Sequence, residues 1–316
     1  MQVRLLKAAN HQILAMQLLS NSEQETVINT VVTTYDKLAI VYQSEQALNQ
    51  TEIFLTEQTR MVEKAYSNGL AISLNKQKIQ LAMQQLKAKR IELDANKKIL
   101  YARIEELTGL SSDSASALRP ELSPWILNEF SGSASDRPDV RALEEAILAT
   151  DYKRKAELAD YTPKVVAFGK KELIKDDLTM LDPEWYVGIG VRWTLFDGLS
   201  AQNSAKQSKL DRRILESRRT EALELANINL KKISYDIEKN MQLITIAKEQ
   251  VAISEAVLNL SRKQFEQGLI TFNDHLSSVN DYEKAQLDYI QSVAQERASA
   301  MDYLASSGKL TIDVVQ

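Results

Sequence analysis

Few side chains in this sequence could do chemistry on a substrate. Cysteine is absent, which excludes thiol catalysis, disulfides and cysteine-ligated metal. The two histidines, His11 and His275, are too few for a histidine-rich metal site. His275 follows a glycine turn, and it either titrates near neutral pH or is an exposed histidine without a role. The sequence therefore predicts neither a metal nor a cofactor.

The other candidates for catalysis are acidic pairs and a glycine pair. Glu105-Glu106 and Glu144-Glu145 fall within expected helices, where a solvated helix face explains such pairs. The segment Gly188-Ile189-Gly190 lacks the third glycine of a dinucleotide-binding loop and opens no helix. The Gly-x-Ser-x-Gly motif of hydrolases is absent. We therefore expect that the protein is not an enzyme.

The composition of the chain favours long helices. Its 316 residues include only nine glycines and five prolines, well below the roughly 7% and 5% of an ordinary globular protein. All five prolines fall between residues 120 and 183. The net charge of −4 argues against a nucleic-acid partner.

The helix breakers are placed in a repeated pattern. Residues 1–68 and 199–267 contain neither glycine nor proline, and these stretches end at Gly69 and Gly268. After each glycine, 39 further residues pass before the next one. Because glycine adopts left-handed dihedrals without steric cost, it commonly ends a helix or forms a tight turn. The pattern predicts two long antiparallel helical hairpins, each turning at a glycine.

The two hairpins are copies of one another. The offset between Gly69 and Gly268 (268 − 69 = 199 residues) also lays Gly109 on Gly308. We expect helices and strands in the following ranges: helices 1–67, 72–108, 140–160, 199–267 and 272–306, and strands near 164–170 and 186–196. The fold class is therefore mainly α with a small strand pair.

The second long helix carries two apolar seams. Alternating steps of three and four residues select 13 positions, ten of them apolar: Leu223, Ala226, Leu230, Ile233, Ile237, Asn240, Ile244, Ala247, Val251, Ser254, Leu258, Ser261 and Phe265. A second seam, rotated by roughly 100° on the helical wheel, consists of Leu243, Ile246, Ile253, Val257 and Leu260. Two seams predict helical neighbours on two sides. A long antiparallel coiled-coil bundle would also satisfy this pattern.

The middle of the chain contains the strand candidates. Residues 110–139 are rich in serine and irregular, and a helix is expected to follow until Pro163. The segment 186–196 alternates strictly, which is typical of a strand that crosses a bilayer in a barrel, or of a half-buried strand in a soluble sheet. One face of this segment holds the apolar residues Val187, Ile189, Val191, Trp193 and Leu195.

These features resemble the outer membrane efflux protein family, the TolC-like channels. The segments that carry the resemblance are Asp136-Arg-Pro-Asp-Val140, Pro163 before a strand, Val187 to Gly198 ending in Leu-Phe-Asp-Gly, and the turn Phe265-Glu-Gln-Gly-Leu269. The resemblance covers essentially the whole chain. It implies an α-barrel tunnel of long helical hairpins, with the strand pair contributing to a transmembrane β-barrel whose apolar face meets outer-membrane lipid.

The resemblance also implies a domain organisation. Residues 1–109 would form the first hairpin, 110–139 a connector, and 140–316 the second copy with its strand pair at 164–196, its hairpin at 199–307 and a short tail. Met1 lies opposite Ser200, so we expect that the first copy lacks its strands and that the chain is truncated at its N-terminus.

The function implied by the resemblance is a homotrimeric exit duct in the cell outer membrane of a Gram-negative-type bacterium, with its helices in the periplasm. It would belong to a tripartite efflux or type I secretion system with a periplasmic adaptor (membrane fusion) protein and an inner-membrane transporter. The alternative is a soluble coiled-coil or adaptor-like scaffold without channel activity.

The resemblance assigns two groups of site residues at the helical tip. The turn residues Gly69, Leu70, Gly268 and Leu269 would contact the adaptor. In the family, aspartates six and nine residues after the turn glycine line the periplasmic gate; here these positions are Asp274, which matches, and Ser277, which does not. Asp274 could instead be a helix N-terminal residue favoured by the helix dipole.

Overall fold

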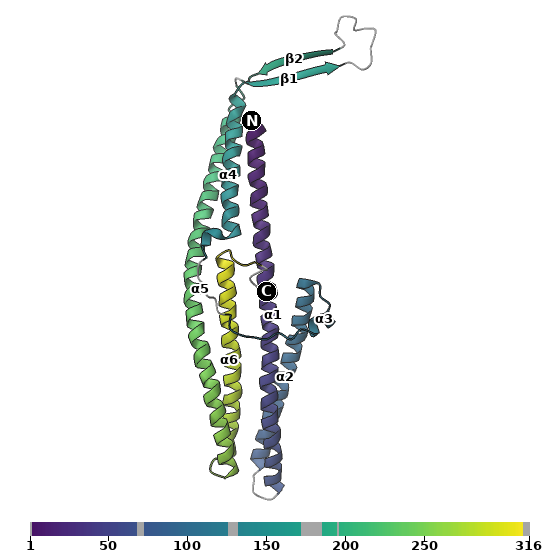
Figure 1. Cartoon of the computed structure of the whole chain (residues 1–316), viewed down its shortest axis with the longest axis vertical. Helices are drawn as coiled ribbons and strands as arrows, with labels where there is room; N and C mark the ends of the chain where they lie inside the picture. The colour runs from purple at the N-terminus through teal and green to yellow at the C-terminus, as the bar shows by residue number, and fades with distance from the viewer. Residues whose placement is uncertain (1, 68–72, 126–131, 172–184, 195, 312–316) are drawn as a thin grey trace. The chain divides into compact units, whose positions relative to one another are not determined.

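The computed structural model of the chain describes residues 2–67, 73–125, 132–171, 185–194 and 196–311. Five long helices account for most of them (Figure 1): α1 (Gln2–Ser67), α2 (Ser73–Thr108), α4 (Pro138–Leu158), α5 (Ser200–Glu266) and α6 (Phe272–Ser306). The short helix α3 (Ser112–Ser116) and the 3-10 turns η1 (Ala134–Asp136) and η2 (Ala159–Tyr161) complete the helical part. The five predicted helices are confirmed. None of the helices in the described ranges is both long and apolar enough to cross a membrane.

The two strands form an antiparallel pair, β1 (Lys164–Lys171) and β2 (Trp185–Arg192). The prediction that the second strand continues to residue 196 is wrong. Beyond Arg192 the indole N–H of Trp193 donates to the Tyr161 carbonyl oxygen at 3.0 Å, and the carboxylate of Asp197 accepts hydrogen bonds from the Tyr161 hydroxyl and the Ala201 N–H, both at 2.8 Å. These bonds direct the chain toward α5, so β2 ends at Arg192, four residues before the predicted end at residue 196.

The helical ends confirm the predicted role of glycine. Gly268, with φ +72°, ends α5: its N–H donates to Phe265 and the Leu269 N–H donates to Gln264, the paired bonds of a Schellman cap. Gly308, with φ +66°, ends α6 with the same pair of bonds. Gly109 has φ +72° and donates to the Glu105 carbonyl. A Cβ at Gly308 would lie 2.6 Å from the Asp136 carbonyl carbon, whereas a Cβ at Gly109 would meet nothing within 4 Å.

The chain divides into two compact units. Unit 1 comprises Met1–Ser22 and Pro138–Leu225, and unit 2 comprises Glu23–Arg137 and Ala226–Gln316. In unit 1, α4 is held against the first part of α1 by the bond between His11 and Glu145 at 2.6 Å. It is held against the first part of α5 by the Arg219–Glu144 and Arg212–Asp151 ion pairs. Glu144 and Glu145 therefore join helices, as a structural pair rather than an acid/base pair.

The core of unit 2 is made by both hairpins. A single cluster joins apolar residues from all four helices: Leu48, Leu55 and Val62 of α1, Ile79 and Leu86 of α2, Leu258 of α5, and Phe272, Val279 and Tyr282 of α6. Between α5 and α6, the Asn240 amide donates to the Ser299 hydroxyl at 2.9 Å. All 13 positions of the first predicted seam are buried or half-buried, so that seam is confirmed.

Within unit 2, a polar clasp fastens the connector to α1 and α6. The Arg297 guanidinium donates to both carboxylate oxygens of Asp36, at 2.8 and 2.9 Å, and to the Ser123 carbonyl at 3.0 Å. The carboxylate of Glu296 accepts from the Trp125 N–H at 2.8 Å. The clasp thus joins α1, α6 and the connector through two buried carboxylates, those of Asp36 and Glu296, and the half-buried Arg297.

Candidate functional site

The turn at Gly268 and the start of α6 form a locally closed structure. Leu269 follows the glycine and is 69% exposed, although it is a large apolar residue. Thr271 is the N-cap of α6, and its hydroxyl accepts from the Asp274 N–H at 3.3 Å. The Asp274 carboxylate accepts from the Thr271 N–H at 3.0 Å and from its hydroxyl at 2.6 Å. These reciprocal bonds are a capping box, which fixes the direction in which α6 leaves the turn.

Asp274 is exposed and ionised in this arrangement. Its pKa lies below the ordinary value because the Thr271 hydroxyl and then the Thr271 backbone N–H donate to the carboxylate. The geometry supports the helix-capping interpretation of Asp274 directly and leaves the carboxylate on the surface. Ser277 is also exposed, one turn further along α6.

Two acidic residues on the same helix escaped the sequence interpretation. Asp281 and Asp288 are exposed, and they follow Asp274 at intervals of seven residues, so the three lie on one face of α6. That heptad spacing was the available signal. The family pattern assigns only the positions six and nine residues after the turn glycine, so it does not point to Asp281 or Asp288.

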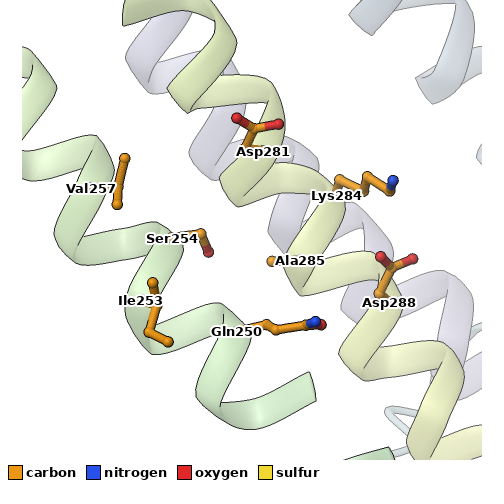
Figure 2. Close-up of a pocket in the computed structure, with 8 residues that line it drawn as sticks. All are labelled: Gln250, Ile253, Ser254, Val257, Asp281, Lys284, Ala285 and Asp288. Atoms are coloured by element: carbon orange, nitrogen blue, oxygen red, sulfur yellow. The ribbon is translucent and has the colours of Figure 1, made fainter. Parts of the chain in front are cut away.

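Asp281 and Asp288 border a shallow groove between α5 and α6 (Figure 2). Its volume is about 360 Å³, and Figure 2 shows the lining side chains coming from the two antiparallel helices. The helix α5 contributes Gln250, Ile253, Ser254 and Val257, and α6 contributes Asp281, Lys284, Ala285 and Asp288. All the charged side chains of the groove therefore come from α6, whereas α5 contributes two apolar and two uncharged polar side chains.

His275 is buried, and the expectation of an exposed histidine is wrong. Its side chain is among the most completely buried of the described residues, with 1% exposure. The imidazole Nδ1 lies 2.9 Å from the Ser261 hydroxyl oxygen, and the ring stacks on Phe265 with centroids 5.5 Å apart. Burial, and secondarily the charge of Arg262, lowers the pKa of His275.

The predicted tip residues of the first hairpin cannot be placed. Gly69 and Leu70 lie outside the described residues. Within the described part of the hairpins, the Lys78 ammonium of α2 donates to the Asn273 side chain of α6 at 2.8 Å, and Lys89 pairs with the buried Glu283. The start of α2 therefore lies beside the start of α6.

The register of the strand pair separates an apolar face from a mixed face. Val191 is paired with Val165, Ile189 with Ala167, and Val187 with Gly169. Directly opposed residues share a face, so this face is apolar on both strands up to its last pair, in which Lys171 is opposed to Trp185. Val187, Ile189, Val191 and Val165 are 75%, 79%, 69% and 72% exposed. Of the other predicted members of this face, Trp193 lies beyond the end of β2 and Leu195 lies outside the described residues.

The opposite face of the pair carries Phe168 and two glycines. Phe168 is paired with Gly188, and a Cβ at Gly188 would come within 2.6 Å of the phenyl ring. The glycines therefore provide the space that the ring occupies. Lys164 and Arg192 are directly opposed at the α-helical end of this face, and Lys170 is opposed to Tyr186 at the other end.

The sequence matches one family of known proteins. The sequence profile of a family described as outer membrane efflux protein matches residues 131–300, more than half of the chain. Among curated proteins, none matches the chain in sequence.

Several solved structures share the fold over nearly the whole chain. VceC, an outer membrane protein of Vibrio cholerae, has a TM-score of 0.81 at 16% identity, covering 96% of this chain and 74% of VceC. The Campylobacter jejuni CmeC outer membrane channel has a TM-score of 0.79 at 15% identity, covering 97% of this chain and 67% of CmeC. The open state of the Neisseria gonorrhoeae MtrE outer membrane channel has a TM-score of 0.77 at 15% identity, covering 98% and 72%.

Proposed function

Since this chain belongs to the outer membrane efflux protein family, a family of transport channels and not of enzymes, we propose that it forms the gated exit duct of a tripartite efflux or type I secretion system. Its place is the cell outer membrane. Membership of this family sets aside the alternative of a soluble scaffold.

The observation that carries the proposal is the apolar face of the strand pair. Val165, Val187, Ile189 and Val191 are each at least 69% exposed on one face of two paired strands. Exposing this surface to water costs a free energy of roughly 25 cal/mol per Å² of apolar area, and contact with lipid would remove that cost. Paired strands with one lipid-facing side are the unit from which a transmembrane barrel is built.

We propose further that the duct is a homotrimer, which the outward faces of unit 2 support. The second predicted seam on α5 is exposed in the single chain: Leu243, Ile246, Ile253, Val257 and Leu260 are 40–64% exposed. The helix α2 also carries exposed apolar residues, namely Leu74, Leu81, Ile91 and Ile99. Two exposed apolar stripes on different helices suit a heterologous contact, in which one copy's α5 meets the next copy's α2.

The two stripes stand at matching levels along unit 2. Lys78 contacts Asn273 and Ser261 contacts His275, which relates positions on α2 and α5 through α6. Three residues beyond Lys78, Leu81 lies level with Leu276 of α6. Because α5 runs antiparallel to α6, the residue of α5 at that level is Leu260. A heterologous contact without a rise along the axis is the kind that a closed ring requires, because a contact with such a rise builds a filament.

Two further parts of the proposal concern the helical turns. We place the adaptor contact at the Gly268–Leu269 turn, with Gly69 and Leu70 as its counterpart, because Leu269 is exposed and apolar. We place the gate at Asp274, whose exposed carboxylates would focus a negative potential where copies converge in a narrow pore.

The test is reconstitution of the intact protein in planar lipid bilayers. We expect stepwise conductance and a cross-linked trimer in detergent. A protein that stays monomeric and conducts no ions would contradict the proposal.

A further inference from the structure

His275 is the most enclosed titratable side chain at the turn that begins α6. Its ring has 1% exposure, is hydrogen-bonded to Ser261 and is stacked on Phe265. Both partners belong to the last turns of α5, and the neighbouring Phe272 also stands 6.1 Å from Phe265 in an edge-on contact. His275 is therefore the polar link in the contact that fastens the first turn of α6 to the end of α5.

The surroundings of His275 suit a neutral imidazole. The charged groups that face it are Arg262 and Glu266 of α5 and Glu57 of α1, while Lys78 of α2 is bonded to the nearby Asn273. Burial and the charge of Arg262 disfavour a second proton, and Glu266 and Glu57 favour it more weakly. The Ser261 hydroxyl donates to the Leu258 carbonyl oxygen at 3.0 Å, so its single proton does not need the imidazole as an acceptor.

We propose that His275 is a proton-sensitive latch that holds the start of α6 against α5 when neutral and releases it when protonated. A proton taken from solvent would place a positive charge among apolar side chains, where an ion is strongly disfavoured. The equilibrium then shifts toward a state in which the imidazolium reaches water. Because Asp274 is the next residue, release of this turn moves the carboxylate that the proposed function places at the gate; the inference rests on that function.

The direction of the pH effect follows from proton linkage. The pKa of His275 lies below its ordinary value of 6.5 in the folded state. The unfolded or released state therefore binds the proton more tightly, so the latch contributes its full stability above about pH 6.5. That contribution is lost as the pH falls through the folded-state pKa. Acidification should favour the released turn.

The experiment compares the intact protein with His275→Gln and His11→Gln between pH 7.5 and 5.5. Glutamine keeps a hydrogen-bonding group toward Ser261 but does not titrate, and His11→Gln removes the other histidine of the chain, which lies in unit 1. In planar bilayers the open probability of the wild type and of His11→Gln should rise as the pH falls, whereas His275→Gln should show a flat profile. A His275→Gln profile that follows the wild type would overturn the proposal.

Two further measurements separate the latch from the channel. Thermal unfolding followed by circular dichroism needs no conductance: the wild-type midpoint should drop across this pH range, and the drop should shrink in His275→Gln only. If His275→Gln does not fold, NMR titration of the histidine Cε1 signals in the wild type replaces it, with His11→Gln providing the assignment. A His275 signal that titrates at or above pH 6.5 would refute the latch even if the protein conducts ions. A depressed titration in a protein that conducts nothing would refute the duct and leave the latch standing.

Discussion

The carboxylate of Asp274 serves the helix and faces the solvent at once. Both hydrogen bonds to Thr271 use the same carboxylate oxygen, Oδ2. The two interpretations drawn from the sequence, a pore carboxylate and a helix N-terminal residue, are therefore compatible in one side chain. Two kinds of variant distinguish the two roles. One removes the negative charge of Asp274 and keeps the helix cap, and the other breaks the cap and keeps the charge.

The first prediction concerns the charge of Asp274. Asp274→Asn keeps an oxygen that can accept the Thr271 bonds but removes the negative charge, so it should lower the cation selectivity of the reconstituted channel, measured as a reversal-potential shift in a salt gradient. Thr271→Ala is the matched control, since it breaks the cap and leaves the carboxylate. It should cost about 1 kcal/mol of unfolding free energy and leave selectivity unchanged. Loss of selectivity in Thr271→Ala alone would contradict the assignment.

A second prediction concerns Asp281 and Asp288, which continue the exposed line of α6. If this face of the helix borders the pore, Asp281→Asn should shift selectivity in the same direction as Asp274→Asn. The effect should be smaller, because the charge would lie away from the narrowest point and be better screened. Glu255→Gln, an exposed acid on α5 outside the groove, is the control. An equal shift in that control would mean that net charge, rather than this face, sets selectivity.

How far single residues could be predicted depended on whether their surroundings lie nearby in sequence. The capping role of Asp274 was foreseeable because Thr271 is three residues away. The burial of His275 depends on Phe265 and Ser261, which reach it only after the chain turns at Gly268. A local signal did exist, since Phe272, His275, Val279 and Tyr282 follow the three-four spacing of a buried helix face.

At the scale of elements, the clasp around Arg297 holds segments that no helical periodicity brings together. Arg297 and Asp36 are separated by 261 residues, and their side chains are 17% and 11% exposed. The helices themselves were predictable because the absence of breakers and the apolar seam are properties of the local sequence. The clasp was not, because its partners come from α1, α6 and the connector.

A third prediction tests the clasp. Arg297→Met removes the cation and leaves the Asp36 carboxylate largely buried without its partner, so it should reduce the free energy of unfolding by about 3 kcal/mol or more. Lys239→Met is the control, because Lys239 and Asp236 form an ion pair at the surface and such pairs contribute at most about 1 kcal/mol. Denaturant unfolding followed by circular dichroism measures both. Similar costs for the two variants would show that the clasp adds little beyond a surface ion pair.

At the scale of the whole molecule, the second apolar seam of α5 forms an exposed stripe that no other part of the described chain covers. The first seam is covered within the chain, whereas Ile253 and its neighbours in the second are not. The prediction that α5 has helical neighbours on two sides is thus confirmed on the side that α6 covers. On the other side, contact with a second copy of the chain stays a prediction.

The fourth prediction addresses that second copy. Ile253→Glu should place a charge in the proposed contact and shift the protein from trimer to monomer in detergent, as measured by light scattering. Ala252→Glu, an exposed position one residue away on the same helix but turned from the stripe by about 100°, should leave the trimer intact. Both variants should retain the helical content of the wild type. A trimer that persists in Ile253→Glu would show that this face of α5 is not a subunit contact.

The fifth prediction concerns docking at the turn. Leu269→Trp adds bulk to an exposed side chain that makes no part of the core, so export in cells should fall while protein level and thermal midpoint stay unchanged. Asn259→Trp, at an exposed position on α5, is the control and should export normally. Unchanged export in Leu269→Trp would count against an adaptor contact at this turn.

Gly109 and Gly308 occupy equivalent places in the two copies and share a left-handed backbone, yet their surroundings constrain them unequally. At Gly109 a mutation meets only the cost of the dihedral angle, which asparagine tolerates, because no atom lies within 4 Å of a new Cβ. At Gly308 any side chain would strike the backbone at Asp136. The two equivalent glycines therefore differ in the substitutions that their surroundings allow: position 109 has room for asparagine, whereas position 308 has room only for glycine.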